Sequence, residues 1–494
     1  MLRFTTVSEL KTNDKVADEI ISQLNLDPLS GINYKAMLRK YLDSYRDELQ
    51  IVVEDNYIDK CYRDSFANFY ATKLRVRYGM SIRLSFIEPG INLPKIGYDH
   101  NDQVELIEKY HGFMVIRPLC HGIVGRTAVS PEALNHGSHI KIMEAPIPTS
   151  IMGLKTVVNA FPHSSQDLQY STCAETSIWS VMEYYGNKYS EYSPLLPSKI
   201  HKILDNRVFQ RHIPSHGLQY TDISYVLMNL GFGCKTYSRD MRNRTTDEDL
   251  IFHRIFSSYI ESGIPLIAAV IGDNLGHAIV CVGKEKIPRN TIKSVNPIHT
   301  SSGGHFLLWN DVKGKYVFND DNKSTCSICD FDNPTPQYAL SRGEISSIIV
   351  PLNKKIYLDV SVAIATTFSL LELFKVSGDY TVRTVLCSGR SYKDALMRDP
   401  NLSLEHKKMF LETIQFPKFI WISEIATLGS FENGIVEGLI LQDATEPSQN
   451  SLSSLIYLAI KNINIFYDID KDTLENKMLS LPINLTSYEG NLIG

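Results

Sequence analysis

The sequence predicts an α+β protein built from about three domains, since its 494 residues exceed the length of one ordinary domain. Hydrophobic residues make up 43% of the chain, which is enough to form packed cores and indicates a folded protein. Within residues 151–350, segments with apolar residues at helical spacing come first and apolar runs typical of strands follow. The same order recurs within residues 351–494. Helices grouped before strands are typical of α+β domains.

Changes in composition mark the expected domain boundaries. Pro146, Pro148 and Pro162 lie where the chain passes into a central region, and the composition changes again from Pro351. We therefore predict an N-terminal α+β domain, a central domain and a C-terminal α+β domain, spanning residues 1–150, 151–350 and 351–494.

The first of these domains carries no recognisable catalytic motif. Charged and apolar residues are mixed over residues 35–64, as on an amphipathic surface, which predicts a helix there. The other elements expected in this domain are a short helix and two strands, over residues 104–110, 112–118 and 122–130.

The central and C-terminal domains have clearer helix and strand signals. Thr246 is followed by three acidic residues and Gly263 ends the same segment, a pattern typical of a helix with an acidic first turn. The expected helices cover residues 173–186, 221–230, 246–263, 361–374 and 403–413. The expected strands cover residues 265–271, 278–282, 314–319, 382–387, 419–425 and 434–442.

Cys173 stands at the start of the first helix expected in the central domain. Ala174, Ile178 and Met182 recur behind it at helical spacing, and Gly186 ends the run. A thiol at a helix N-terminus meets unpaired N–H groups and the positive end of the helix dipole, which favour the thiolate. Cys173 is therefore a candidate nucleophile, although a free cysteine is more often a small buried hydrophobic residue.

Downstream segments supply partners for such a thiol. His277 follows a glycine and opens an apolar strand, so its ring is held rigidly at a strand end. Asn319, Asp320 and Asp321 end the next strand, and any of them could accept a hydrogen bond from an imidazole. His305 also opens a strand after two glycines and is the alternative base.

The order of a helix-initial Cys, a Gly-His strand and a strand ending in Asp or Asn resembles the papain-like cysteine peptidases. It is most similar to their bacterial branch related to bacteriocin-processing peptidases, over residues 150–350. The resemblance implies a papain-like central domain with Cys173 as nucleophile and His277 as general base and then acid. It implies Asp320 as the residue that fixes the imidazole tautomer.

Two positions depart from the family pattern. The family places an oxyanion-hole glutamine where this chain has Asp167, so Gln166 and Gln169 are the candidates for that donor. Glu175 lies in the first helical turn, where a carboxylate facing Cys173 would raise the pKa of the thiol.

The resemblance implies acyl transfer through a thioester, in which Cys173 attacks a peptide or isopeptide carbonyl and water releases the acyl group. The same residue types serve transglutaminases and deamidases, so the acceptor stays open. A catalytically silent peptide-binding or regulatory module is the alternative from another class. The expected partners are a protein or peptide substrate and a regulatory protein that binds the flanking domains.

Other kinds of partner and site are not expected. The formal net charge is −5 and no block of basic residues stands out, so neither nucleic acid nor an anionic membrane is expected to bind. No segment reaches the roughly 18 apolar residues of a spanning helix, and eight scattered cysteines agree with the reducing cytoplasm. Cys326 and Cys329 lack a second ligand pair for zinc, so we expect no metal and no cofactor.

Overall fold

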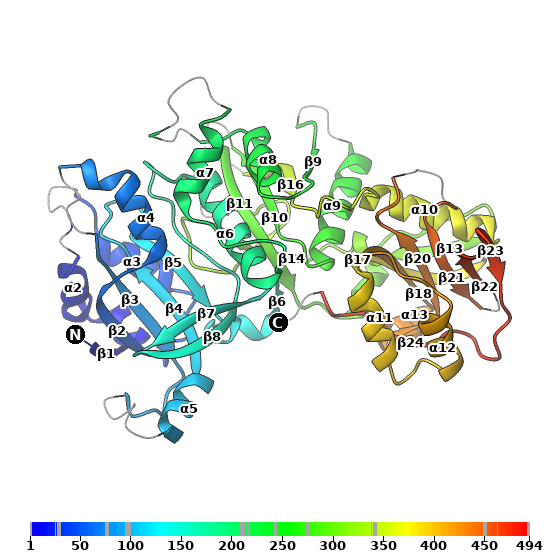
Figure 1. Cartoon of the computed structure of the whole chain (residues 1–494), viewed down its shortest axis with the longest axis horizontal. Helices are drawn as coiled ribbons and strands as arrows, with labels where there is room; N and C mark the ends of the chain where they lie inside the picture. The colour runs from blue at the N-terminus through cyan, green and yellow to red at the C-terminus, as the bar shows by residue number, and fades with distance from the viewer. Residues whose placement is uncertain are drawn as a thin grey trace.

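The protein is a mixed α+β structure in which three large sheets follow one another along the chain. The computed structural model describes residues 2–24, 26, 31–74, 79–93, 100–207, 213–214, 217–241, 245–272, 276–336, 338, 343–447, 452–461 and 463–491. The N-terminal, central and C-terminal sheets succeed one another along the longest axis, from blue through green to orange and red in Figure 1. Within these described ranges, no helix has both the length and the apolar character required to cross a membrane.

The N-terminal sheet is antiparallel, with its strands in sequence order. Its strands are β1 (Leu2–Thr6), β2 (Gln50–Tyr57), β3 (Ser81–Ile87), β4 (Tyr110–Ile116) and β5 (Val124–Val129). The helices of this region are α1 (Val7–Thr12), α2 (Asp14–Ser22), α3 (Tyr34–Leu42), α4 (Lys60–Asn68) and α5 (His100–Glu108).

The prediction of a helix over residues 35–64 was wrong. α3 ends at Leu42, and β2 then crosses the middle of the predicted helix. Ile51, Val52 and Val53 are consecutive, β-branched and buried. These residues favour a strand that pairs with β1 and β3, although the charged and apolar residues around them are mixed as in an amphipathic helix.

The central sheet is also antiparallel, in the order β15-β14-β11-β10-β16-β9, with β6 paired to β11. Its strands are β6 (Ile140–Ile142), β9 (Lys235–Ser238), β10 (Leu266–Ile271), β11 (Gly276–Glu285), β14 (Lys315–Asn319), β15 (Ser327–Asp330) and β16 (Glu344–Val350). The hairpin of β7 (Ala145–Ile151) and β8 (Leu154–Ala160) precedes it, with helices α6 (Cys173–Lys188), α7 (Pro197–Leu204), α8 (Tyr220–Asn229) and α9 (Thr246–Glu261).

Helix α6 lies at the centre of this arrangement. It packs against β7 and β11, and every residue from Ala174 to Tyr185 is buried. A helix buried on all sides is fixed by packing along its whole length, so its first residue is held in one place relative to β11.

The C-terminal sheet runs in the order β12-β13-β17-β18-β20-β21-β22-β23, and β13 and β17 are its parallel pair. Its strands are β12 (Ile298–His299), β13 (Gly304–Leu308), β17 (Gly378–Ser388), β18 (Phe419–Ala426), β20 (Gly438–Asp443), β21 (Leu455–Ile460), β22 (Ile463–Asp468) and β23 (Thr473–Asn476). A small pair joins β19 (Ile435–Val436) to β24 (Leu485–Thr486), and the helices are α10 (Val360–Leu373), α11 (Gly389–Arg398), α12 (Leu404–Glu412) and α13 (Leu428–Glu432).

Sheet membership crosses the predicted domain boundaries in two places. β12 and β13 precede residue 350 but belong to the C-terminal sheet, and β6 precedes residue 150 but pairs with β11 of the central sheet. The boundaries at 150 and 350 stay predictions, because chain order alone does not say which sheet an added strand joins.

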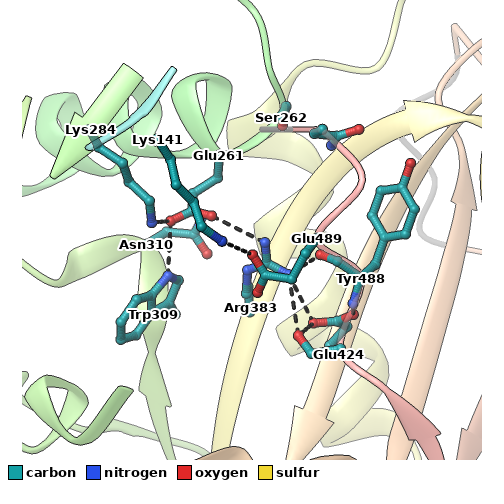
Figure 2. A network of polar contacts seen from close by, with 12 residues as sticks. Lys141, Glu261, Ser262, Lys284, Trp309, Asn310, Arg383, Glu424, Tyr488 and Glu489 are labelled. Carbon is teal, nitrogen blue, oxygen red and sulfur yellow. Dashed lines mark hydrogen bonds and ion pairs between the residues drawn. The ribbon is translucent and has the colours of Figure 1, made fainter. Parts of the chain in front are cut away.

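A buried ion network joins the central and C-terminal sheets (Figure 2). Arg383 on β17 lies 3.1 Å from Glu261, at the end of α9, and 3.1 Å from Glu424 on β18. Burial alone would raise the pKa of Glu261, but the charges of Lys284 and Arg383 lower it to about 2. The indole N–H of Trp309 also donates to Glu261, at 2.9 Å.

The last described residues return to this network. Arg383 donates to the backbone carbonyl of Tyr488 at 2.7 Å, and the Tyr488 N–H donates to Glu424 at 2.6 Å. Glu489 forms ion pairs with Lys141 of β6 at 2.9 Å and with Arg289 at 2.7 Å. This segment therefore contacts both large sheets at their junction.

We expect replacement of Arg383 by Met to lower the free energy of unfolding by about 3–5 kcal/mol, since two buried carboxylates lose their shared cation. Urea denaturation followed by circular dichroism measures the loss. Arg398→Met is the matched control, because the Arg398 side chain is 79% exposed and forms its ion pair with Asp394 on its own helix. Equal stability of the two variants would contradict the importance of the network.

Candidate active site

Cys173 is the first residue of α6, as the sequence predicts, and it is partly exposed. Thr172 is the N-cap, and its backbone N–H donates to Glu175 Oε2 at 3.1 Å. The Thr172 hydroxyl donates to the same oxygen, so the buried Glu175 carboxylate is folded back onto the cap. The carboxylate that departs from the family pattern therefore serves as a helix cap.

His277 is the second residue of β11, and the sheet brings it to Asp320. β14 runs antiparallel to β11 with Asn319 opposite Val280, so the residue after β14 lies beside the beginning of β11. His277 Nε2 lies 3.0 Å from Asp320 Oδ1. His277 keeps 16% of its side-chain surface exposed, while Asp320 is buried.

His277 also contacts the thiol. Burial lowers the pKa of His277, but hydrogen bonds to Asp320 and Cys173 and the carboxylates of Asp320 and Asp321 raise it well above its ordinary value. Burial would raise the pKa of Asp320, but the hydrogen bond and charge of His277 lower it. The sequence-predicted Cys173, His277 and Asp320 are thus brought together, with the imidazole between the other two.

Tyr338 and Asn322 hold the Asp320 carboxylate in place. The Tyr338 hydroxyl lies 2.9 Å from both Asp320 oxygens and 3.3 Å from His277 Nε2. The Asn322 N–H donates to Asp320 Oδ1 at 2.9 Å, and its side-chain amide donates to the Tyr338 oxygen at 2.9 Å. Sequence reasoning missed both residues, because neither a single tyrosine nor a single asparagine forms a recognisable motif.

The alternatives for the third residue occupy different environments. The Asn319 side-chain oxygen accepts the Cys326 N–H at 2.9 Å, so this amide serves the loop after β14. Asp321 Oδ1 lies 3.6 Å from His277 Nε2, beyond hydrogen-bond distance. Burial, together with the charge of Asp320, raises the pKa of Asp321 well above its ordinary value.

The alternative base, His305, lies on β13 in the C-terminal sheet. Its ring Nδ1 is 3.0 Å from Asp379, and both side chains are largely exposed. Figure 1 places β13 far from the beginning of α6. The structure therefore brings His277, and not His305, to Cys173.

The two oxyanion-hole candidates point to different partners. Gln166 Nε2 donates to Asn322 Oδ1 at 2.9 Å, which connects it to the residues around Asp320. Gln169 Oε1 accepts from Lys73 Nζ at 2.5 Å. Asp167 accepts the backbone N–H groups of residues 169–171 at 2.8–3.0 Å and so shapes the loop before α6.

The eight cysteines are all free, and most are held as thiols. Burial raises the pKa of Cys234 and Cys326 to about 12 and that of Cys329 to about 11. Burial likewise raises the pKa of Cys61, Cys281 and Cys387. The remaining two cysteines are Cys120 and Cys173. Of these, Cys173 is the one that forms the hydrogen bond with His277 described above.

No family model matches the sequence, and no curated protein sequence matches it either.

We expect Asp320→Asn to lower the pKa of His277. The amide carries no charge, so burial, which favours the neutral imidazole, is opposed only by the weaker remaining contacts. Titration of the ring Cε1 resonance by NMR of histidine-labelled protein measures the change. Asp332→Asn, at an exposed position, is the control and should leave that resonance unchanged. An unaltered His277 pKa in Asp320→Asn would exclude Asp320 as its charge partner.

Proposed function

We propose that the chain is a cysteine-dependent acyl-transfer hydrolase, and more specifically a peptidase with a papain-like central domain. One observation carries the proposal: the His277 imidazole contacts both Asp320 and Cys173, and that thiol begins a buried helix. A nucleophile, a base and a residue that orients the base are the parts that thiol acyl transfer requires.

The proposed reaction has two halves. The Cys173 sulfur attacks the carbonyl carbon of a peptide or isopeptide bond, and imidazolium His277 then gives its proton to the departing amine. The resulting thioester is attacked by water, whose proton passes to His277 as the acyl group leaves as a carboxylic acid. Asp320 accepts from Nε2, so Nδ1 is the ring nitrogen left to serve the thiol.

Gln166 is the better candidate for the oxyanion donor. Its side-chain N–H is directed toward Asn322, which itself bonds to Asp320, whereas Gln169 uses its oxygen to bind Lys73. A side-chain N–H beside the Cys173 backbone N–H would stabilise the negative charge that develops on the carbonyl oxygen.

Two features bear on the alternatives. A carboxylate facing Cys173 would favour the silent peptide-binding module, but the Glu175 carboxylate instead accepts hydrogen bonds from the N-cap residue Thr172. Transglutaminase or deamidase chemistry differs from peptidase chemistry only in the substrate and acceptor. We propose water as acceptor, a protein or peptide as substrate, the reducing cytoplasm as the compartment, and the flanking domains as the place where a regulatory protein binds.

We expect iodoacetamide to modify Cys173 faster than any other cysteine at neutral pH, since an adjacent imidazolium favours the thiolate. Cys120 is the matched control because it has the same partial exposure. His277→Ala should slow labelling of Cys173 at least 10-fold and leave Cys120 unchanged. Rates resolved by peptide mass spectrometry across pH 5–9 give the comparison.

The proposal fails if Cys173 labels no faster than Cys120, or if loss of His277 leaves its labelling rate and pH profile unchanged. The silent binding module would then be the better hypothesis.

We also expect Gln166→Ala to slow acylation of Cys173 by about 10²–10³-fold, the usual effect of removing one oxyanion-hole donor. Release of nitrophenolate from a p-nitrophenyl ester measures the acylation rate, with Cys173→Ala as the blank. Gln169→Ala, three residues away in the same loop, should retain nearly full activity. A larger loss for Gln169→Ala would assign the donor to Gln169 instead.

A further inference from the structure

Asp321 is a buried carboxylate that the acyl-transfer mechanism does not use. Only 5% of its side chain is exposed, and among the residues that the structure describes neither of its side-chain oxygens has a partner with ordinary hydrogen-bond geometry. Burial of an ionised carboxylate without a partner is costly, and of the two adjacent carboxylates only Asp320 lies within hydrogen-bond distance of His277. A divalent cation bound beside His277 would neutralise both Asp320 and Asp321, which the single positive charge of the imidazolium does not.

The geometry of these three residues fits zinc. Zn–N and Zn–O bonds of about 2.0–2.1 Å at tetrahedral angles place neighbouring ligand atoms about 3.3 Å apart. His277 Nε2 lies 3.0 Å from Asp320 Oδ1 and 3.6 Å from Asp321 Oδ1. The first distance is slightly shorter and the second slightly longer than the spacing between two zinc ligands. All three ligand atoms lie within 4.8 Å of one another, so small side-chain rotations would complete the set.

The surroundings supply what ligands of a metal need. Tyr338 and Asn322 donate hydrogen bonds to Asp320 and orient its carboxylate, as outer residues do around protein-bound zinc. With the imidazole neutral and both carboxylates ionised, the three side chains carry a charge of −2, which a divalent ion neutralises as it displaces their protons. Three protein ligands leave a fourth position for water.

We propose that His277, Asp320 and Asp321 form a Zn²⁺ site that overlaps the Cys173 and His277 pair and inhibits it. Zinc bound at Nε2 separates His277 from Asp320 and leaves the remaining ring proton on Nδ1. The ring then has no free lone pair with which to accept a proton from Cys173. The binding step itself needs no peptidase activity, so it stands independently of the proposed function.

Equilibrium dialysis of the full chain against chelator-buffered Zn²⁺, with elemental analysis of the protein, tests the site. We expect one Zn²⁺ per chain, and a loss of affinity of at least about 100-fold in Asp321→Asn, which exceeds the 10–100-fold typical of an outer residue. His277→Ala should lose the ion as well. Co²⁺ bound in its place should show the visible absorption of tetrahedral coordination, and thermal melts confirm that each variant is folded.

The matched controls separate this site from other ligands. Asp332→Asn alters an exposed carboxylate, and the Cys326→Ser, Cys329→Ser double variant removes the Cys-x-x-Cys thiols. Both should keep full affinity. Zinc bound equally well by Asp321→Asn, lost on removal of Cys326 and Cys329, or not bound at all would each overturn the proposal.

A second readout connects the metal to the thiol. Zn²⁺ should slow iodoacetamide labelling of Cys173 in the unaltered chain but not in Asp321→Asn. If His277→Ala without metal leaves Cys173 labelling unchanged, the peptidase proposal fails, whereas the dialysis result still decides the zinc site.

Discussion

The guanidinium of Arg383 is the contact on which the relation between the two larger sheets depends. It reaches from β17 to a carboxylate on α9 and to another on β18, and it also holds the backbone of Tyr488. α9 packs against β11 of the central sheet, so the network connects the strand of His277 to the C-terminal sheet through this helix. Removing Arg383 would take the shared cation from Glu424 and leave Glu261 with Lys284, so the buried charges of this junction depend on one another.

The site itself follows from two ordinary features of packing. Burial of α6 against β11 fixes Cys173 beside His277, and the pairing of β14 with β11 fixes Asp320 on the other side of the ring. Hydrogen bonds from Tyr338 and Asn322 then orient the carboxylate. Asp167 shapes the loop before α6 and Glu175 caps that helix, so both carboxylates serve the local structure around Cys173.

Local patterns predicted much of the central region. The acidic first turn of α9 and Gly263 after its end predicted the bounds of this helix to within a few residues. The apolar run after His277 predicted β11. Cys173, His277 and Asp320 were expected together on the strength of their order, and the structure places them in contact.

Long-range pairing is what the sequence could not reveal. β2 forms because it pairs with strands distant in the sequence, and β13 joins the C-terminal sheet because it pairs with β17. A short segment of sequence contains no information about such distant partners. Carboxylates usually face water, but Glu424 is buried because it pairs with Arg383 on the neighbouring strand. The roles of Tyr338 and Asp321 likewise depend on neighbours that only the folded chain brings close.

The bulge on β11 has a consequence for how the chain tolerates change. Its register against β14 shifts between Cys281 and Gly283, and a side chain at Gly283 would collide with the backbone of β6. Side chains alternate between the two faces of a strand, so adding or deleting one residue between His277 and this bulge would turn the imidazole to the opposite face. The segment from His277 to the bulge therefore tolerates substitutions better than insertions or deletions.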